Sequence, residues 1–324
     1  LFSAAAGDVT WNTSGLKMSV NDKGFVTSLR DVTNNIEYLP AGSIVPLLSI
    51  RCNGEIENPA LLKNKGRELT LTYEKNKISA RILVVARPGY LTFELTDIRP
   101  FEKVELVIWG PYQTTITETI GECVGVVCNS EFALGIQALN VKTLGGYPSE
   151  ENDIEPSFNI FDSNPVDIGE EWKKQKLYRG QTAKATEQGS MVQAYCRNRL
   201  KDRVINNWGH EKYVAPAFND GGVKGSKIAL FGCPADQALK TIGEIELAEG
   251  LPHPVIDGGW GKTARSATAS YLIIDFGEED LDKAIELTKK AGLKYLYHGG
   301  PFETWGHFKP DEKAFPDNWT SMKR

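Results

Sequence analysis

Several features are scarce in this sequence, and their scarcity excludes whole classes of protein. The 324 residues include five cysteines, an odd and low number that rules out a scaffold stapled by disulfides. No stretch approaches the roughly 20 consecutive apolar residues that a membrane-spanning helix needs, so we expect no membrane insertion. Basic residues do not exceed acidic ones, 37 against 42, and this balance gives no electrostatic footprint for nucleic acid.

Motifs for common cofactors and nucleophiles are also missing. His210-Glu211 begins like a zinc-protease motif, but Val214 stands where the second histidine must be. The glycine-rich segment 258–262 lacks the spacing of a phosphate-binding loop, and no Gly-x-Ser-x-Gly elbow occurs. We therefore expect no cofactor, and the sequence assigns no metal site.

In the first part of the chain, apolar and polar residues alternate strictly. Leu69, Leu71 and Tyr73 alternate with threonines, and similar runs recur between residues 8 and about 145. Turn signals such as Asn53-Gly54 separate these runs. Many short strands at this spacing predict a mainly β protein with a large antiparallel β-sandwich.

After residue 250 the sequence pattern changes from that of antiparallel strands to that of an α/β unit. A helix is predicted at 234–249 and ends before Gly250. Beyond it, an apolar run at 271–274, an amphipathic helix at 278–291 and a second apolar run at 293–297 predict a strand–helix–strand unit with parallel strands. The predicted organisation is therefore a sandwich domain at 1–250, a linker at 251–270 and an α/β segment at 271–324.

The α/β segment is short for a domain of its own. A (β/α)8 barrel needs about 250 residues, so segment 271–324 can hold at most two barrel strands. An isolated strand–helix–strand pair leaves both sheet edges open. We expect that the chain is the N-terminal part of a longer protein with a truncated barrel; the alternative is that the unit is an appendage packed on the sandwich.

The C-terminal residues also resemble a known family. Tyr271–Phe276, Glu278-Glu279, Gly292–Tyr297 and Asp311–Pro316 resemble the first barrel strands of α-galactosidase-like (clan D) glycoside hydrolases. The resemblance implies a galactose-mutarotase-like β-sandwich followed by a TIM barrel. It places the catalytic carboxylates on later barrel strands, so no catalytic residue is transferred. Where that family carries two aspartates before Gly-Trp, this sequence has residues 298–302, beginning with histidine.

Four residues of this segment are candidates for substrate binding. Asp275 and His298 each follow a predicted strand, and the carboxyl ends of such strands carry the active sites of barrels. Trp305 could stack on a sugar ring, and Glu303 could accept hydrogen bonds from hydroxyl groups. The structural alternatives are that Asp275 caps the following helix and that the other three residues only pack in loops.

A run of cations is a further candidate. Arg197, Arg199, Lys201 and Arg203 alternate, so in an extended strand all four share one face. Such a face would suit an acidic polysaccharide. The alternative is a solvated edge strand whose charges block unwanted pairing.

These observations lead to one principal functional hypothesis. The chain is predicted to be part of a glycoside hydrolase that degrades an oligo- or polysaccharide, inactive as this chain alone, with carbohydrate as its partner. Residues 1–7 resemble the end of a secretory signal, which predicts a secreted or periplasmic protein. The alternatives are a non-catalytic carbohydrate-binding β-sandwich, or a protein of the polysaccharide lyase or epimerase type.

Overall fold

Alternating burial shapes the strands of the first part of the chain. In β7 (Glu68–Tyr73) Leu69, Leu71 and Tyr73 are fully buried, while the residues between them are half-buried. This confirms the predicted period of two. The alternation disappears in β10 (Leu106–Thr114), where most residues on both faces are buried. A strand covered on both sides needs apolar residues at successive positions.

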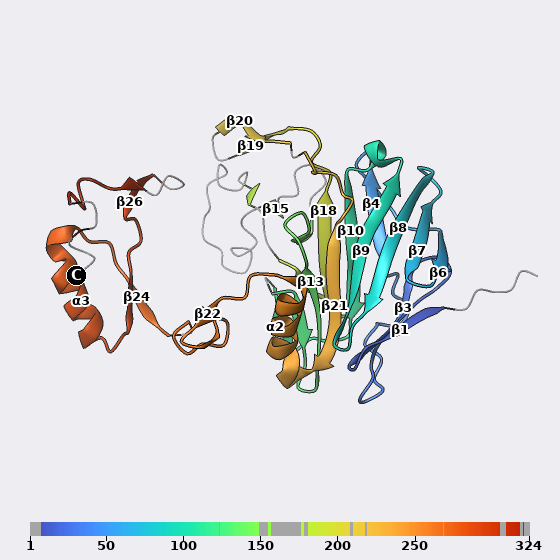
Figure 1. The fold of residues 1–324 in the computed structure, drawn as a ribbon, viewed down its shortest axis with the longest axis horizontal. Coiled ribbons are helices and arrows are strands. Elements are labelled where there is room, and N and C mark those ends of the chain that lie inside the picture. The colour runs from blue at the N-terminus through green and yellow to red at the C-terminus, as the bar shows by residue number, and fades with distance from the viewer. Residues whose placement is uncertain are drawn as a thin grey trace, which may run out of the picture. The chain divides into compact units, whose positions relative to one another are not determined.

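The computed structural model describes residues 8–122, 124–148, 155–156, 176–177, 181–207, 210–217, 219–267, 269–304, 309–317 and 320. The chain divides into two units, Leu1–Leu251 and Pro252–Arg324 (Figure 1). Within the described part, no helix is long and apolar enough to cross a membrane.

The first unit is built from antiparallel sheets (Figure 1). One sheet has the order β14 (Leu144–Gly145), β18 (Gly189–Arg197), β10, β4 (Leu48–Cys52) and β5 (Glu55–Glu57), with β17 (Ala183–Thr186) also paired to β18. The eight-stranded sheet has the order β11 (Thr119–Gly121), β12 (Val126–Cys128), β13 (Phe132–Ala138), β21 (Lys227–Pro234), β9 (Tyr90–Arg99), β8 (Ile78–Ala86), β7 and β6 (Leu61–Lys65). A third sheet has β1 (Val9–Asn12), β2 (Leu16–Val20) and β3 (Val26–Asp31).

Two-residue to six-residue strands form smaller pairs in the same unit. These are β15 (Glu155–Pro156) with β16 (Lys176–Leu177), and β19 (Arg203–Asn207) with β20 (His210–Ala215). Short 3₁₀ turns lie at η1 (Phe101–Lys103) and η3 (Ala235–Gln237).

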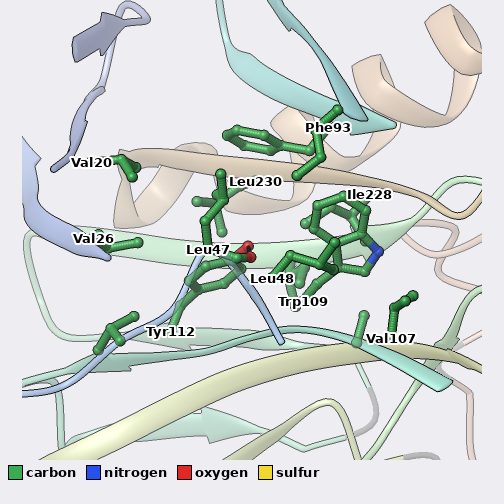
Figure 2. Close-up of a cluster of buried hydrophobic side chains, with 14 of the residues drawn as sticks. Val20, Val26, Leu47, Leu48, Phe93, Val107, Trp109, Tyr112, Ile228 and Leu230 are labelled. Carbon is green, nitrogen blue, oxygen red and sulfur yellow. Dashed lines mark hydrogen bonds between the residues drawn. The ribbon is translucent and has the colours of Figure 1, made fainter. Parts of the chain in front are cut away.

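One hydrophobic core joins the three large sheets, as Figure 2 shows. Trp109 of β10 is fully buried, and its ring lies 6.4 Å from that of Phe93 on β9 in the opposite sheet. The Trp109 Nε1–H donates to Ser226 Oγ at 2.9 Å, and the Tyr73 hydroxyl donates to the Leu48 carbonyl at 2.8 Å. The polar atoms of these buried aromatic side chains thus have hydrogen-bond partners. The two larger sheets pack face to face with an apolar core between them, which is the arrangement of a β-sandwich.

Helix α2 (Ala238–Glu249) packs on β21 and confirms the predicted helix. Gly250 follows it with φ of +70°, a left-handed conformation that ends helices and that glycine adopts without a steric penalty. The prediction that the apolar stripe of this helix is buried is confirmed for Ile242 and Ile245, but Leu239 is half exposed.

The second unit contains the predicted strand–helix–strand element. Strand β24 (Tyr271–Ile273) pairs in parallel with β25 (Tyr295–Tyr297), and α3 (Leu281–Lys290) connects them after η4 (Glu278–Asp280). The unit also contains the hairpins β22 (Val255–Ile256) with β23 (Gly259–Trp260), and β26 (Phe302–Thr304) with β27 (Lys309–Pro310). The described residues contain this single parallel pair and no barrel, so the expected TIM-barrel segment is reduced to one βαβ unit.

The cationic run does not form the single extended strand that its alternation suggested. Strand β18 ends at Arg197, and β19 begins only at Arg203. Between them Asn198 turns the chain, because its backbone N–H donates to the Glu105 carbonyl and its side chain donates to the Val104 carbonyl. Arg197 is itself buried, so the hypothesis of one shared cationic face is wrong.

Candidate functional site

The structure brings Asp275 and His298 together at one edge of the parallel pair. His298 directly follows β25, and Asp275 lies two residues beyond β24. In parallel strands the carboxyl ends meet at the same edge, and the bond from Ile274 N–H to the Tyr297 carbonyl extends the pairing to that point. The His298 Nδ1 atom lies 3.6 Å from Asp275 Oδ1.

His298 is held from several sides. Its side chain is only 11% exposed, and its Nε2 lies 2.7 Å from the Phe276 carbonyl oxygen. Nδ1 accepts a hydrogen bond from the Gly300 N–H at 3.1 Å, and Nε2 lies 3.2 Å from the Phe276 N–H nitrogen. The ring packs edge-on against Phe276 and Phe315, at centroid distances of 4.6 and 5.4 Å. His298 therefore fixes the two strand ends and the loop after β25, and it does not project into solvent.

Asp275 has the opposite character. Its side chain is 76% exposed, so the carboxylate meets solvent at the edge where the two strands end. A Cβ atom at position 299 would lie 2.6 Å from Asp275 Oδ1, so the glycine there leaves room for the carboxylate. The arrangement presents a hydrogen-bond acceptor on a backbone that His298 holds in place. Such an acceptor can bind the hydroxyl groups of a ligand.

The other two predicted residues do not join this pair in the described structure. Glu303 lies on β26, where its Oε2 pairs with Lys309 Nζ at 3.0 Å. Lys309 also pairs with Glu312, and the hydrogen bonds that its ammonium group donates to the carboxylates of Glu312 and Glu303 raise the pKa of Lys309. Glu303 is thus part of an exposed ion-pair cluster in the hairpin. Trp305 lies outside the described residues.

The buried cysteines Cys52 and Cys196 are poor candidates for a nucleophile. Cys52, Cys128, Cys196 and Cys233 are free thiols, and Cys123 lies outside the described residues. Burial raises the pKa of the Cys196 thiol to about 11, and burial together with nearby Glu57 raises that of Cys52 to about 11. The thiolate is the reactive form, so Cys52 and Cys196 are unreactive near neutral pH.

Metal binding has no candidate cluster in the part of the chain that is described. No group of three or more histidine, cysteine, aspartate or glutamate side chains is placed to hold an ion there. The acidic residues between 149 and 170, apart from Glu155, fall outside the described residues, and the side chain of Glu155 is not described either.

Sequence reasoning missed a second surface, at one end of the sandwich. Hollows there are lined by Phe101, Leu200 and Lys224, which are far apart in the sequence. The available signal was the phenylalanine of Arg99-Pro100-Phe101, which stands in a turn directly after an alternating strand. In the structure the Phe101 side chain is 45% exposed.

Comparisons with known proteins give distant structural likenesses only. No protein-family model and no curated protein matches the chain. A GH31 family sulfoquinovosidase from E. rectale has 11% identity and a TM-score of 0.36, over 97% of this chain and 46% of that one. The GH36 α-galactosidase AgaA from Geobacillus stearothermophilus has 9% identity and a TM-score of 0.32, over 96% of this chain and 53% of that one. The AgaA variant A355E D548N, in complex with raffinose, has 9% identity and a TM-score of 0.30.

The chain thus spans about half the length of the solved structures it matches. The identities are low and the scores are small. At this level the comparisons do not assign the chain to a family.

Proposed function

We propose that this chain is part of a carbohydrate-active protein of the glycoside hydrolase type, in which Asp275 binds sugar hydroxyl groups. The observation that carries the proposal is the exposed Asp275 carboxylate beside His298, at the carboxyl ends of two adjacent parallel strands. Enzymes built on parallel α/β barrels place substrate-binding groups at that edge. The resemblance of residues 271–316 to the α-galactosidase-like family supports the same function.

The proposal gives the two residues different roles. Asp275 accepts hydrogen bonds from hydroxyl groups, and a charged acceptor strengthens each bond. His298 is a positioning residue, because its contacts with Phe276 and Gly300 hold the loop against which Asp275 lies. No residue of this chain is assigned to bond cleavage. In a retaining hydrolase that step needs two carboxyl groups about 5–5.5 Å apart.

The βαβ unit is proposed to be the beginning of a barrel. One set of side chains on its parallel pair, Tyr271, Ile273, Tyr295 and Tyr297, is exposed. Parallel sheets usually have both faces covered, and proteins usually cover or blunt the open edges of a sheet. The exposed face and the two-stranded extent of this pair support a larger parallel sheet of which β24 and β25 are members.

Export to the periplasm or the cell exterior is also part of the proposal. It fits a substrate that is a polysaccharide. The residues that suggested a secretory signal, 1–7, lie outside the described part of the chain. Extraction of the protein from cell fractions of its source tests this point directly, and recovery of the protein in the cytoplasmic fraction alone would contradict it.

Titration calorimetry with neutral and acidic oligosaccharides tests the role of Asp275. Asp275→Asn removes the charge and keeps the shape, and hydrogen bonds to charged groups contribute about 1.5–3 kcal/mol. We therefore expect the affinity for the best ligand to fall by a factor of about 10 to 150. The matched control is Asp257→Asn in the β22–β23 turn, where φ is +52° and asparagine is well tolerated.

The outcomes separate the functions that the sequence left open. Equal affinities of the Asp275→Asn variant, the Asp257→Asn variant and the unchanged chain would refute the assignment of Asp275. Hydrolysis of a glycan by the complete gene product supports the hydrolase. Release of an unsaturated product that absorbs ultraviolet light from acidic glycans would instead support the lyase alternative.

A further inference from the structure

Three hollows adjoin at one end of the sandwich, with volumes of about 630, 380 and 680 Å³. Leu200 lines the first and second, Lys224 the first and third, and Phe101 the second and third. Because each pair shares a lining residue, the three hollows are neighbours on one surface, which we treat as a unit. We call it the sandwich-end groove and define it by Glu94, Phe101, Glu102, Leu200, Lys201 and Lys224.

One wall of the sandwich-end groove is fixed by Asn198. Its backbone N–H donates to the Glu105 carbonyl at 2.8 Å, and its Nδ2 donates to the Val104 carbonyl at 2.9 Å. Its Oδ1 also accepts a hydrogen bond from the Leu200 N–H at 3.2 Å. These bonds hold the segment that carries Leu200 and Lys201 against the segment that carries Phe101.

The opposite wall is fixed by Lys142. Its Nζ donates to the backbone carbonyls of Asp220 at 2.6 Å, Gly222 at 3.2 Å and Lys224 at 3.0 Å. One ammonium group thus gathers the whole loop from 219 to 225. The Arg199 N–H donates to the Gly221 carbonyl at 2.6 Å and ties this loop to the first wall. The backbone around the groove is therefore organised before any ligand arrives, which lowers the entropic cost of binding.

The backbone around the groove is held by hydrogen bonds, whereas several side chains that line the groove are exposed and have no hydrogen-bond or ion-pair partner among the described residues. Phe101 is 45% exposed and Leu200 39% exposed, so an apolar surface lies open between the walls. Glu94, Glu102, Lys201 and Lys224 form no side-chain hydrogen bond or ion pair with any residue in the described ranges. Nearby Asp97 differs, since Arg81 and Arg99 both pair with it. The groove therefore offers an aromatic surface surrounded by donors and acceptors that are available to a ligand.

We infer that the sandwich-end groove binds a neutral oligosaccharide. A pyranose has an apolar face that packs on an aromatic ring and hydroxyl groups that both donate and accept hydrogen bonds. The available side chains are two lysines and two glutamates, so neither sign of charge dominates, and a polyanion gains no net attraction. The inference rests on the proposed carbohydrate-directed function and adds a second binding surface, in the first unit of the chain.

Titration calorimetry of the whole chain with neutral gluco-, galacto-, manno- and xylo-oligosaccharides tests this inference. We expect Phe101→Ala to weaken binding of the best ligand about 10-fold, because an aromatic contact of roughly 1.4 kcal/mol is lost. Ile44→Ala is the matched control, since Ile44 is 69% exposed and lies outside the groove. The double variant Lys201→Ala/Lys224→Ala supplies a second test through hydrogen bonds, and circular dichroism verifies that each variant is folded.

The inference and the proposed function fail in different ways. Loss of affinity in Phe101→Ala and in the double lysine variant, with Ile44→Ala unchanged, supports the groove. If only Asp275→Asn weakens binding, the groove is overturned and the proposed role of Asp275 stands. If only the groove variants weaken binding, the role of Asp275 fails and the groove stands. Binding of acidic glycans alone, or of no glycan, overturns the inference.

Discussion

Glu249 is expected to be a main anchor of helix α2 on the eight-stranded sheet. Its Oε1 accepts a hydrogen bond from the Tyr90 hydroxyl at 2.9 Å, and its Oε2 lies 2.6 Å from Lys227 Nζ. Both partners lie on strands of that sheet, and the Glu249 side chain is only 7% exposed. Replacement by alanine therefore leaves a buried hydroxyl and a mostly buried ammonium group without this acceptor.

Each donor deprived of its partner costs about 1–3 kcal/mol, so Glu249→Ala is expected to lower the free energy of unfolding by about 3 kcal/mol. For a unit of this size, 1 kcal/mol corresponds to about 2–4 °C in Tm, which predicts a decrease of roughly 6–12 °C. Glu244→Ala is the control on the same helix. Its carboxylate is 59% exposed and 4.0 Å from Lys240, so we expect a change of at most about 0.5 kcal/mol.

The pH dependence provides a separate check. Burial alone would raise the pKa of Glu249, but hydrogen bonds from Lys227 and Tyr90 outweigh it and lower the pKa. An unfolded glutamate titrates near pH 4.3, so this stabilisation is complete above about that pH and is lost as pH falls through the lower folded value. The difference in unfolding free energy between the unchanged chain and Glu249→Gln should thus be constant from pH 7 to about 5 and shrink in more acidic solution.

Urea unfolding followed by far-ultraviolet circular dichroism measures these quantities. The reasoning is refuted if Glu249→Ala is no less stable than Glu244→Ala. It is also refuted if the difference between the unchanged chain and Glu249→Gln grows as the pH is lowered.

Two further predictions concern the backbone of the first unit. Gly250→Ala should cost about 1 kcal/mol, because φ is +70°, whereas Gly250→Asn should cost less; equal thermal stability of the two variants would contradict this. Lys142→Met removes the ammonium donor shared by the carbonyls of Asp220, Gly222 and Lys224, and a local loss of about 2 kcal/mol predicts roughly 30-fold faster hydrogen exchange in segment 219–225. Unchanged exchange there would show that other contacts hold the loop.

Local patterns in the sequence determined most of the secondary structure. The alternation in Leu69–Tyr73 predicts a half-buried strand because side chains of successive residues point to opposite faces. Gly250 marks the end of α2 because left-handed backbone favours glycine. The parallel pair of β24 and β25 follows from a strand–helix–strand pattern, since such a connection joins parallel strands. Each of these features is marked by a pattern within one continuous stretch of the chain.

Interactions between distant residues decided the rest. The sequence placed Asp275 and His298 at strand ends, but only packing against Phe276 and Phe315 turned the histidine inward and left the carboxylate exposed. The alternation of the cations after residue 196 predicted one strand, but hydrogen bonds from Asn198 to a different part of the chain ended it. Contacts between sheets join residues far apart in the chain, so no short sequence pattern predicts them.

The sandwich-end groove shows this limit most clearly. Phe101 follows β9, Leu200 follows β18, and Lys224 precedes β21. No periodicity relates these positions in the sequence. They meet because β21 pairs with β9 in one sheet, while β18 pairs with β10 in the sheet that packs against it. The sequence alone determined which residues form strands, and the order of strands in the folded sheets decided which side chains share a surface.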